Sequence, residues 1–322
     1  MSLTGFRILA GILIQAVLIL NIFTSTSQLL RKATPPFGFY PSNDKILAVL
    51  EDSSRVTLSA AGGIKVSELE SVEVICDLYE AGDIVKFDFL DRSRTFTREF
   101  QLTRFYSTFH VFTQLAIAAI FILVGSFVLY KQPKEVAAFI FYLCCTGVAA
   151  ILMMTWGTAK TEPVWSGDMN RAIFHLAYGM VPVLFVHFSM VYPVRIDRRM
   201  RFLLIPLYML AVLFFSTNFT AWIYFHSSPN SGIISTYTGF FDHSRLFILL
   251  CVVIAIAIFI YSYVKATRVE DKKRLLWLLT GFLVGPLGFV LLWVIPQAFT
   301  GEGLVSETFV SFDRNGKAHR RT

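Results

Sequence analysis

Residues 246–264 read LFILLCVVIAIAIFIYSYV and contain no charged side chain. A helix needs about 20 apolar residues to cross the hydrocarbon core of a bilayer, so this stretch predicts a transmembrane helix. Further stretches of the same kind cover residues 8 to about 29, 106–130, 136–156, 172–192, 202–225 and 275–296. The fold class predicted is therefore a polytopic α-helical membrane protein with about seven transmembrane helices.

The composition of the chain supports a membrane location. Of its 322 residues, 55% are hydrophobic and 16% are charged, and the mean hydropathy is +0.61. A soluble domain usually carries about 25% charged residues. The net charge of +7 could indicate nucleic-acid binding, but basic residues of membrane proteins collect in cytoplasmic loops. We therefore expect no nucleic-acid partner.

The basic residues of the short loops predict the direction of the chain, because cytoplasmic loops carry an excess of Lys and Arg. With the N-terminus in the cytoplasm, only Lys160, Arg171 and Arg245 lie outside, and residues 226–244 form an outside loop. Twelve basic residues then lie inside: Arg7, Lys131, Lys134, Arg195, Arg198, Arg199, Arg201, Lys265, Arg268, Lys272, Lys273 and Arg274. The first helix is expected to be an uncleaved anchor, since residues 23–27 contain no Ala-x-Ala site; a cleaved signal peptide is the alternative.

A polar block separates the first predicted helix from the second. We divide the chain into an N-terminal transmembrane anchor (1–32), an extracytoplasmic domain (33–104), a six-helix transmembrane region (105–300) and a basic C-terminal tail (301–322). The polar block is long enough to cross the membrane whatever its charge, so it does not enter the count of basic residues.

Residue patterns within the polar block predict a small α+β fold. Strands are expected at 46–50, 85–90 and 95–102, where apolar residues run together or alternate with polar ones. A helix is expected near 67–79, with Ser67 and Glu70 as a capping box, and turns at 81–83 and 91–93. The predicted core consists of the residues on the apolar faces: Val72, Ile75, Leu78, Val85, Phe87 and Phe89.

The order of these elements resembles the second half of a bacterial PDZ domain. The residues that match the family pattern lie at 63–67, 69, 77–79 and 82–87. The first half of the pattern matches less well, because the family's "AGLKxGD" turn has no good counterpart and Phe37-Gly38-Phe39 only faintly echoes its carboxylate-binding loop. The resemblance implies a PDZ-like domain outside the membrane; a small fold that packs against the helices and binds nothing is the alternative.

Three further segments are HFSMVYP at 187–193, KKRLLWLLTG at 272–281 and GEGLVSE at 301–307. They resemble the "HFxLVFP", "RRQLRWLLxG" and "GxPLLPEE" segments of multi-span sensor regions in bacterial signalling proteins, such as ComP-like sensor histidine kinases and SpoIIE-type phosphatases. The resemblance implies a sensor-input module in the bacterial cytoplasmic membrane. Its output domain would be a histidine kinase, a serine/threonine phosphatase or a diguanylate cyclase.

In such relatives an eighth span leads to the catalytic domain. Here residues 308–312 begin a similar span, and residues 313–322 then form a basic tail. We expect a truncated or frameshifted chain, with a genuine seven-span protein as the alternative. The loops are too short for a catalytic core, so the chain as it stands is not expected to be an enzyme.

Candidate signal or coupling residues come from charged or hinge-like positions near the membrane. Ionisable groups in spans are costly and often functional, which points to His175 and His187. They lie twelve residues apart, about 120° around a helix, so we do not expect a joint metal site. The other candidates are an arginine loop facing the output (Arg195, Arg198, Arg199, Arg201) and a possible hinge in the last span (Gly285, Pro286), for which close helix packing is the ordinary interpretation.

Sequence motifs of several enzyme classes do not occur. There is no His-Glu-x-x-His, no Gly-x-Ser-x-Gly and no Walker A loop, so metalloprotease, serine protease and nucleotide-binding sites are disfavoured, and no cofactor is expected. The expected partners are membrane lipids, an extracytoplasmic peptide or small-molecule signal, and a second copy of the chain in a homodimer. A transporter or channel, and a scaffold that uses the PDZ-like domain for protein binding, are the alternative functions.

Overall fold

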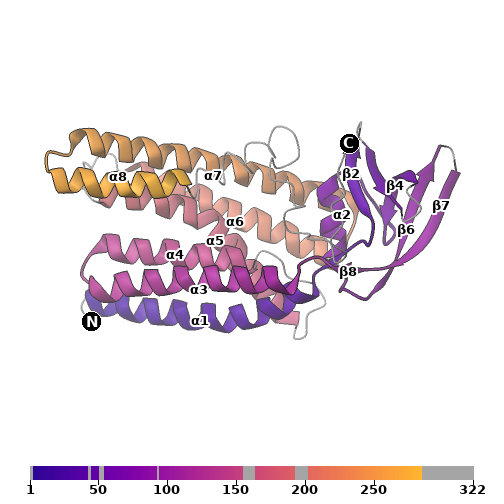
Figure 1. The fold of residues 1–322 in the computed structure, drawn as a ribbon, viewed down its shortest axis with the longest axis horizontal. Helices are drawn as coiled ribbons and strands as arrows, with labels where there is room; N and C mark the ends of the chain where they lie inside the picture. The colour runs from indigo at the N-terminus through magenta and orange to yellow at the C-terminus, as the bar shows by residue number, and fades with distance from the viewer. Residues whose placement is uncertain are drawn as a thin grey trace.

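The computed structural model describes residues 3–42, 45–50, 54–92, 94–154, 164–192 and 202–284. Six helices in these ranges are long and apolar enough to cross a membrane, as expected of a helical multi-pass membrane protein. A small β-sheet domain covers one end of the helix bundle (Figure 1). We name this end the domain end and the opposite end the far end.

The six long helices run along the bundle between these two ends (Figure 1). They are α1 (Leu3–Arg31), α3 (Thr108–Lys131), α4 (Val136–Met154), α5 (Val164–Val191), α6 (Leu204–Ser227) and α7 (Ser231–Lys265). Helix α4 packs between α3 and α5, and α5 also packs against α6 and α7. At the far end, the guanidinium of Arg7 donates a hydrogen bond to the backbone carbonyl of Lys134 at 2.7 Å.

The structure corrects two helix boundaries. Residues 226–244 were expected to form an outside loop, but α7 already begins at Ser231, and its N-cap Asn230 accepts a hydrogen bond from the backbone N–H of Ile233 at 3.0 Å. Helix α5 likewise begins eight residues before the predicted span, at Val164 rather than 172. In both helices, the added turns bear polar side chains that hydropathy excludes from a span. As shown below, these side chains contact the domain.

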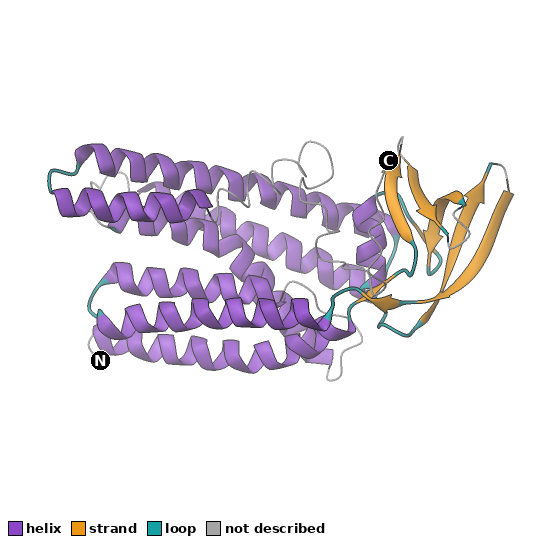
Figure 2. Cartoon of the chain, viewed as in Figure 1, coloured by secondary structure: helices purple, strands orange, loops and turns teal. Residues whose placement is uncertain are grey.

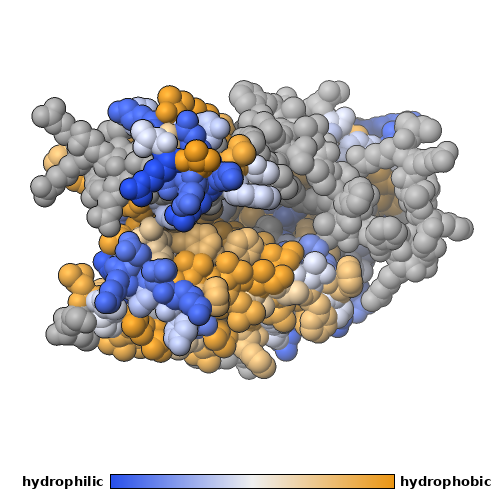
Figure 3. All heavy atoms as spheres, turned by 60° about the vertical axis from the view of Figure 1, so that its left-hand side comes forward, coloured by the Kyte–Doolittle hydropathy of each residue, from blue (hydrophilic) through white to orange (hydrophobic). Residues whose placement is uncertain are grey.

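The last predicted span is described only in part. Helix α8 (Val269–Val284) covers the first half of the predicted stretch 275–296 and packs against α7. The remainder of that stretch and the tail 301–322 lie outside the described residues. In Figure 3, hydrophobic side chains cover much of the visible flank of the bundle, while hydrophilic ones gather near the far end.

The domain is built on an antiparallel sheet with the strand order β2-β3-β4-β6-β7. Figure 2 shows it in orange beyond the helices. Its strands are β2 (Gly38–Ser42), β3 (Lys45–Val49), β4 (Arg55–Ala61), β6 (Ile84–Asp91) and β7 (Arg94–Gln101), with β5 (Ile64–Lys65) paired to β4. A separate two-stranded ribbon joins β1 (Ala33–Thr34) to β8 (Thr103–Arg104).

The predicted hairpin and its buried face are confirmed. Val85, Phe87 and Phe89 are at most 4% exposed, whereas the side chain of Lys86 between them is 70% exposed. The preceding turn has Gly82 at φ +104°, a conformation that favours glycine. The backbone N–H of Glu80 donates to the Asp83 carboxylate across this turn at 3.0 Å.

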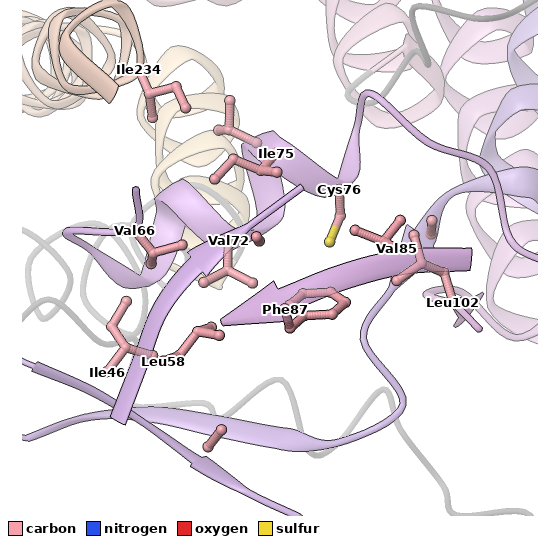
Figure 4. Close-up of a cluster of buried hydrophobic side chains, with 14 of the residues drawn as sticks. Ile46, Leu58, Val66, Val72, Ile75, Cys76, Val85, Phe87, Leu102 and Ile234 are labelled. Carbon is pink, nitrogen blue, oxygen red and sulfur yellow. The ribbon is translucent and has the colours of Figure 1, made fainter. Parts of the chain in front are cut away.

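One short helix, α2 (Leu69–Cys76), covers the sheet, and its apolar residues Val72 and Ile75 are fully buried. The helix predicted near 67–79 is thus confirmed in a shorter form, but the capping box is wrong. The N-cap is Glu68, which makes no side-chain capping bond; its carboxylate instead accepts a hydrogen bond from Thr238 of α7 at 3.4 Å. Figure 4 shows Val72 and Cys76 of α2 pointing toward Phe87, with Ile75 on the side of the helix nearer Ile234 of α7.

Candidate functional site

Helix α2 carries its acidic residues on the side that faces the helix bundle. Glu70, Glu73 and Asp77 are separated by three and four positions, so they lie along one face of the helix. Val72 and Ile75 lie on the face toward the sheet. The domain therefore presents a row of carboxylates to the ends of the membrane helices. We name the contact between α2 and the bundle the junction.

The central contact of the junction is a buried ion pair. The guanidinium of Arg171 on α5 donates to the carboxylate of Asp77 at 3.0 Å, and these two side chains are only 4% and 7% exposed. The guanidinium carbon also lies 5.8 Å from the ring centre of Trp222 on α6. Removing one partner of such a pair leaves an uncompensated buried charge, which costs about 3–5 kcal/mol.

A second cation, Lys32, lies at the point where α1 leads into the domain. Its side chain is 1% exposed, and its ammonium is 4.0 Å from the Glu73 carboxylate. The same ammonium lies 3.9 Å from the ring centre of Phe105, at the entrance to α3. A lysine that is buried to this degree needs such compensation, because an isolated buried charge is strongly disfavoured.

The third cation is Arg245 of α7. Its guanidinium contacts Glu70 at 2.9 Å and Asp242 at 2.6 Å, and it also lies 5.3 Å from the ring centre of Phe241. Three acidic residues of the domain thus pair with three basic residues from different parts of the bundle. The pairs fix α2 to α1, α5 and α7 at the same time.

Apolar contacts continue across the junction. The buried cluster that forms the domain core also contains residues of α6 and α7, namely Ala221, Trp222, Phe225, Ile234 and Tyr237. The domain and the domain end of the bundle therefore share one hydrophobic core, so they pack as a single unit rather than as two separate bodies.

Polar contacts extend from the junction into the bundle. Directly beside Arg171 on α5, the side-chain amide of Asn170 donates to Gln28 of α1 at 3.0 Å and to Thr24 at 3.2 Å. The buried Oδ1 of Asn170 and Nε2 of Gln28 have no hydrogen-bond partner among the described residues. Buried polar groups of this kind cost free energy when they lack a hydrogen-bond partner. The layer beside the ion pairs therefore contains two polar atoms that destabilise it unless they are satisfied.

Burial dominates the proton equilibria of the junction. It raises the pKa of the Asp77 carboxyl above its ordinary value of 3.8, while Lys32 and Arg171 oppose that shift. Burial also raises the pKa of the Cys76 thiol, and the nearby Asp77 adds to this effect. Cys76 is therefore a neutral core thiol rather than a reactive nucleophile.

The structure places the two candidate histidines in different surroundings on α5. His175 is 2% exposed and lies 3.5 Å from the hydroxyl of Tyr237, at the edge of the junction. His187 lies three turns further along, with its Nδ1 3.0 Å from the hydroxyl of Tyr208 on α6. Within the described ranges, no group of three or more His, Cys, Asp or Glu residues could hold a metal ion.

The remaining candidates lie outside the described residues. They are the arginines of the predicted output-facing loop and the pair in the last span: Arg195, Arg198, Arg199, Arg201, Gly285 and Pro286. Nothing in the described structure tests their assignment.

The charged residues of the junction were not among the predicted site residues, although the sequence contains two signals for them. Arg171 and Arg245 are two of the three basic residues assigned to the outside, against the general bias. The carboxylates of α2 lie on one helical face opposite the apolar residues. The two sides of this contact are the row of acids on α2 and the arginines at the ends of the predicted spans.

Comparison with protein-family models, with curated proteins and with solved structures found no match for this chain.

Proposed function

We propose that this chain is the membrane sensor-input module of a bacterial signal-transduction protein. The small domain would lie outside the cytoplasmic membrane, where it binds a peptide or small-molecule signal as a PDZ-like domain, and the far end would face the cytoplasm. The observation that carries the proposal is the buried Asp77–Arg171 pair, which joins the signal-facing domain to a transmembrane helix.

A buried ion pair favours all-or-none coupling. When two charges are paired in a low-dielectric site, separating them by a small distance exposes each to an unfavourable environment. Packed interfaces therefore move between discrete arrangements rather than stretch continuously. A signal that displaced α2 would have to carry Arg171 with it or break the pair, and either event would change the position or environment of α5.

Helices α5 and α7 provide a continuous path to the far end. Helix α5 contains 28 residues and α7 contains 35, which correspond to about 42 and 52 Å at 1.5 Å per residue. Arg171 and Arg245 lie in the parts of these helices near the domain. A shift or rotation imposed there would reach the loops that we propose contact a cytoplasmic output domain, such as a kinase, phosphatase or cyclase.

Distance measurement between spin labels would test this proposal. Tyr130 of α3 and Val264 of α7 are 80% and 74% exposed near the far end, so each can be replaced by a labelled cysteine. The four native cysteines are buried. In lipid nanodiscs, Arg171→Ala should change the distribution of label distances, whereas Lys86→Ala on the solvent face of the domain should leave it unchanged.

Hydrogen exchange at α2 provides the necessary internal check. If Arg171→Ala increases exchange at α2 but leaves the far-end distances unchanged, the domain is not coupled to the far end and the sensor proposal is wrong. That result would favour the scaffold function, in which the domain binds a protein and the helices only hold it at the membrane.

A further inference from the structure

Five buried polar residues gather where α1, α2 and α5 meet. Two lie at the end of α1 and directly after it, two are neighbours on α5, and one comes from α2. Asp77 of α2 pairs with Arg171 at 3.0 Å, and the positive charge of Lys32 also acts on the Asp77 carboxylate. We name these residues the polar cluster, and each is at most 5% exposed: Gln28, Lys32, Asp77, Asn170 and Arg171.

The two amide side chains of the polar cluster satisfy each other only in part. The Nδ2 of Asn170 donates to the Oε1 of Gln28 at 3.0 Å. The Nε2 of Gln28 and the Oδ1 of Asn170 are buried and have no hydrogen-bond partner among the described residues; we name them the orphan amide atoms. Rotating both amides by half a turn keeps the direct bond in the reverse sense and again leaves one donor and one acceptor. In either orientation, the contact between α1 and α5 therefore has one donor and one acceptor to offer.

The chemistry of the orphan amide atoms restricts what can bind to them. An anion would meet the Oδ1 of Asn170, which carries a partial negative charge, in a cluster that already holds the Asp77 carboxylate. A cation would meet the N–H of Gln28, in a cluster that already holds the charges of Lys32 and Arg171. A neutral molecule that donates one hydrogen bond and accepts another satisfies both atoms. Water is the smallest such molecule, and a buried water typically makes about three hydrogen bonds to polar groups of this kind.

We propose that the polar cluster binds a buried water molecule between α1 and α5. The water accepts a hydrogen bond from the Nε2–H of Gln28 and donates one to the Oδ1 of Asn170. The direct bond between the two amides keeps the orphan amide atoms beside each other, within reach of a single water molecule. Asn21 offers a contrast on the same helix, because its buried side-chain amide donates to the carbonyl of Val17 in α1 itself, at 2.7 Å.

A water molecule at this place would ease movement of α5 against α1. If the two helices shift, the direct bond between Asn170 and Gln28 breaks, and a neighbouring water can take up the released donor and acceptor. Arg171 directly follows Asn170, so a displacement of α2 that pulls on Arg171 acts on this contact at once. This role in signalling rests on the proposed function, whereas the water site itself does not.

Solid-state NMR of the full ¹⁵N-labelled chain in lipid bilayers tests the site, with water itself as the probe. Magnetisation that starts on water should reach the side-chain amides of Gln28 and Asn170 at short mixing times. The backbone amides of Ala149 and Met153 are the internal controls, because both residues are 0% exposed in the interior of α4. They should receive about five-fold less, since helix-interior N–H groups are already paired. Transfer to both side-chain amides at the level of these controls would overturn the proposal.

Two leucine variants separate a specific site from general hydration of α1. Asn170→Leu removes the orphan acceptor, and should lower transfer from water to the Gln28 side chain about three-fold, because the water loses one of its partners. Asn21→Leu removes the satisfied amide two turns away and should leave that transfer unchanged. Equal loss in both variants would show that water enters along α1 without a specific site, and would overturn the proposal. A chemical shift of the Gln28 amide that follows the salt concentration would overturn it as well, because an ion would then be the occupant.

The far-end spin-label distance separates the role in signalling from the water site. Gln28→Leu with Asn170→Leu replaces the hydrated contact by an apolar one, which has no alternative partner for a shifted arrangement. We expect this double variant to reduce the distance change caused by Arg171→Ala about two-fold. If water reaches Gln28 but the double variant does not alter that change, the water site stands and its role in signalling is wrong. If Arg171→Ala changes the distance but no water reaches Gln28, the sensor function stands and the water site is wrong.

Discussion

Two ion pairs that involve the domain differ in how deeply they are buried. Asp77 and Arg171 meet at 3.0 Å in the junction with side chains 4–7% exposed, whereas Lys86 and Glu99 on the β6–β7 hairpin are 3.6 Å apart and 59–70% exposed. A surface pair contributes about 0–1 kcal/mol, because water screens it. Removing one member of a buried pair is strongly destabilising, because the other charge stays buried without a partner. The domain therefore contacts the long helices through α2, while the ion pair on its hairpin is exposed to solvent.

The largest expected effect is that of Arg171→Ala. It leaves the Asp77 carboxylate buried without its closest partner, so we expect the domain to lose about 3–5 kcal/mol of stability. The measurement is hydrogen exchange of the domain amides in nanodiscs, with α2 as the first region to gain exchange. A loss below about 1 kcal/mol would show that Lys32 and solvent compensate Asp77, and would remove the contrast between the two pairs.

The second expected effect is a dependence of the free energy of unfolding on pH that arises from Asp77. Its pKa is raised above 3.8 by burial, so between 3.8 and the raised value the folded state holds a proton that the unfolded state has lost. The stability that Asp77 contributes is full below pH 3.8 and is lost as the pH rises through the folded pKa. Stability relative to Asp77→Asn should therefore fall with rising pH in that window.

Other charged groups face Asp77, and they set the control for this experiment. They are Arg171 of α5 and Lys32 at the end of α1, and Tyr237 of α7 also interacts with Asp77. Glu73 on the same helix is also a carboxyl group, so the pair of proteins is compared a second time in a Glu73→Gln background. A difference between the two proteins that stays constant with pH would contradict the assignment to Asp77.

A smaller effect is expected from Glu70→Gln. Glu70 is 32% exposed, and Arg245 keeps its second partner Asp242, so the lost interaction is partly screened and partly replaced. We expect a loss of about 1 kcal/mol, measured by thermal unfolding of the purified chain. A loss as large as that of Arg171→Ala would mean that the edge of the junction is as important as its centre.

The smallest effect is expected from Lys86→Ala. The side chain points to solvent and only its surface pair with Glu99 is removed, so the change in stability should lie between about 0 and 1 kcal/mol. Limited proteolysis of the domain is a sufficient measurement. Clear sensitisation to protease would show that the hairpin packs against something outside the described residues.

The parts of the fold that depend on local pattern were predictable from the sequence. Uniform hydropathy marked the spans, and the alternation around Phe87 identified the hairpin and its buried face. The junction was not predictable in this way, because its central contact joins residues 94 positions apart. Hydropathy also excluded the first turns of α7, since Asp242 and Arg245 lower it, although Arg245 is one of the residues that meet the domain.

The two-stranded ribbon of β1 and β8 has a consequence for how this architecture could be rebuilt. Ala33 pairs with Arg104, and the backbone N–H of Phe105 donates to the carbonyl of Lys32 at 2.9 Å. The polypeptide thus enters and leaves the whole domain at one point, as in an inserted cassette. Since two such strands can be joined by a two-residue turn, a chain that connects α1 to α3 in this way would omit the domain and leave the ends of both helices at the same separation.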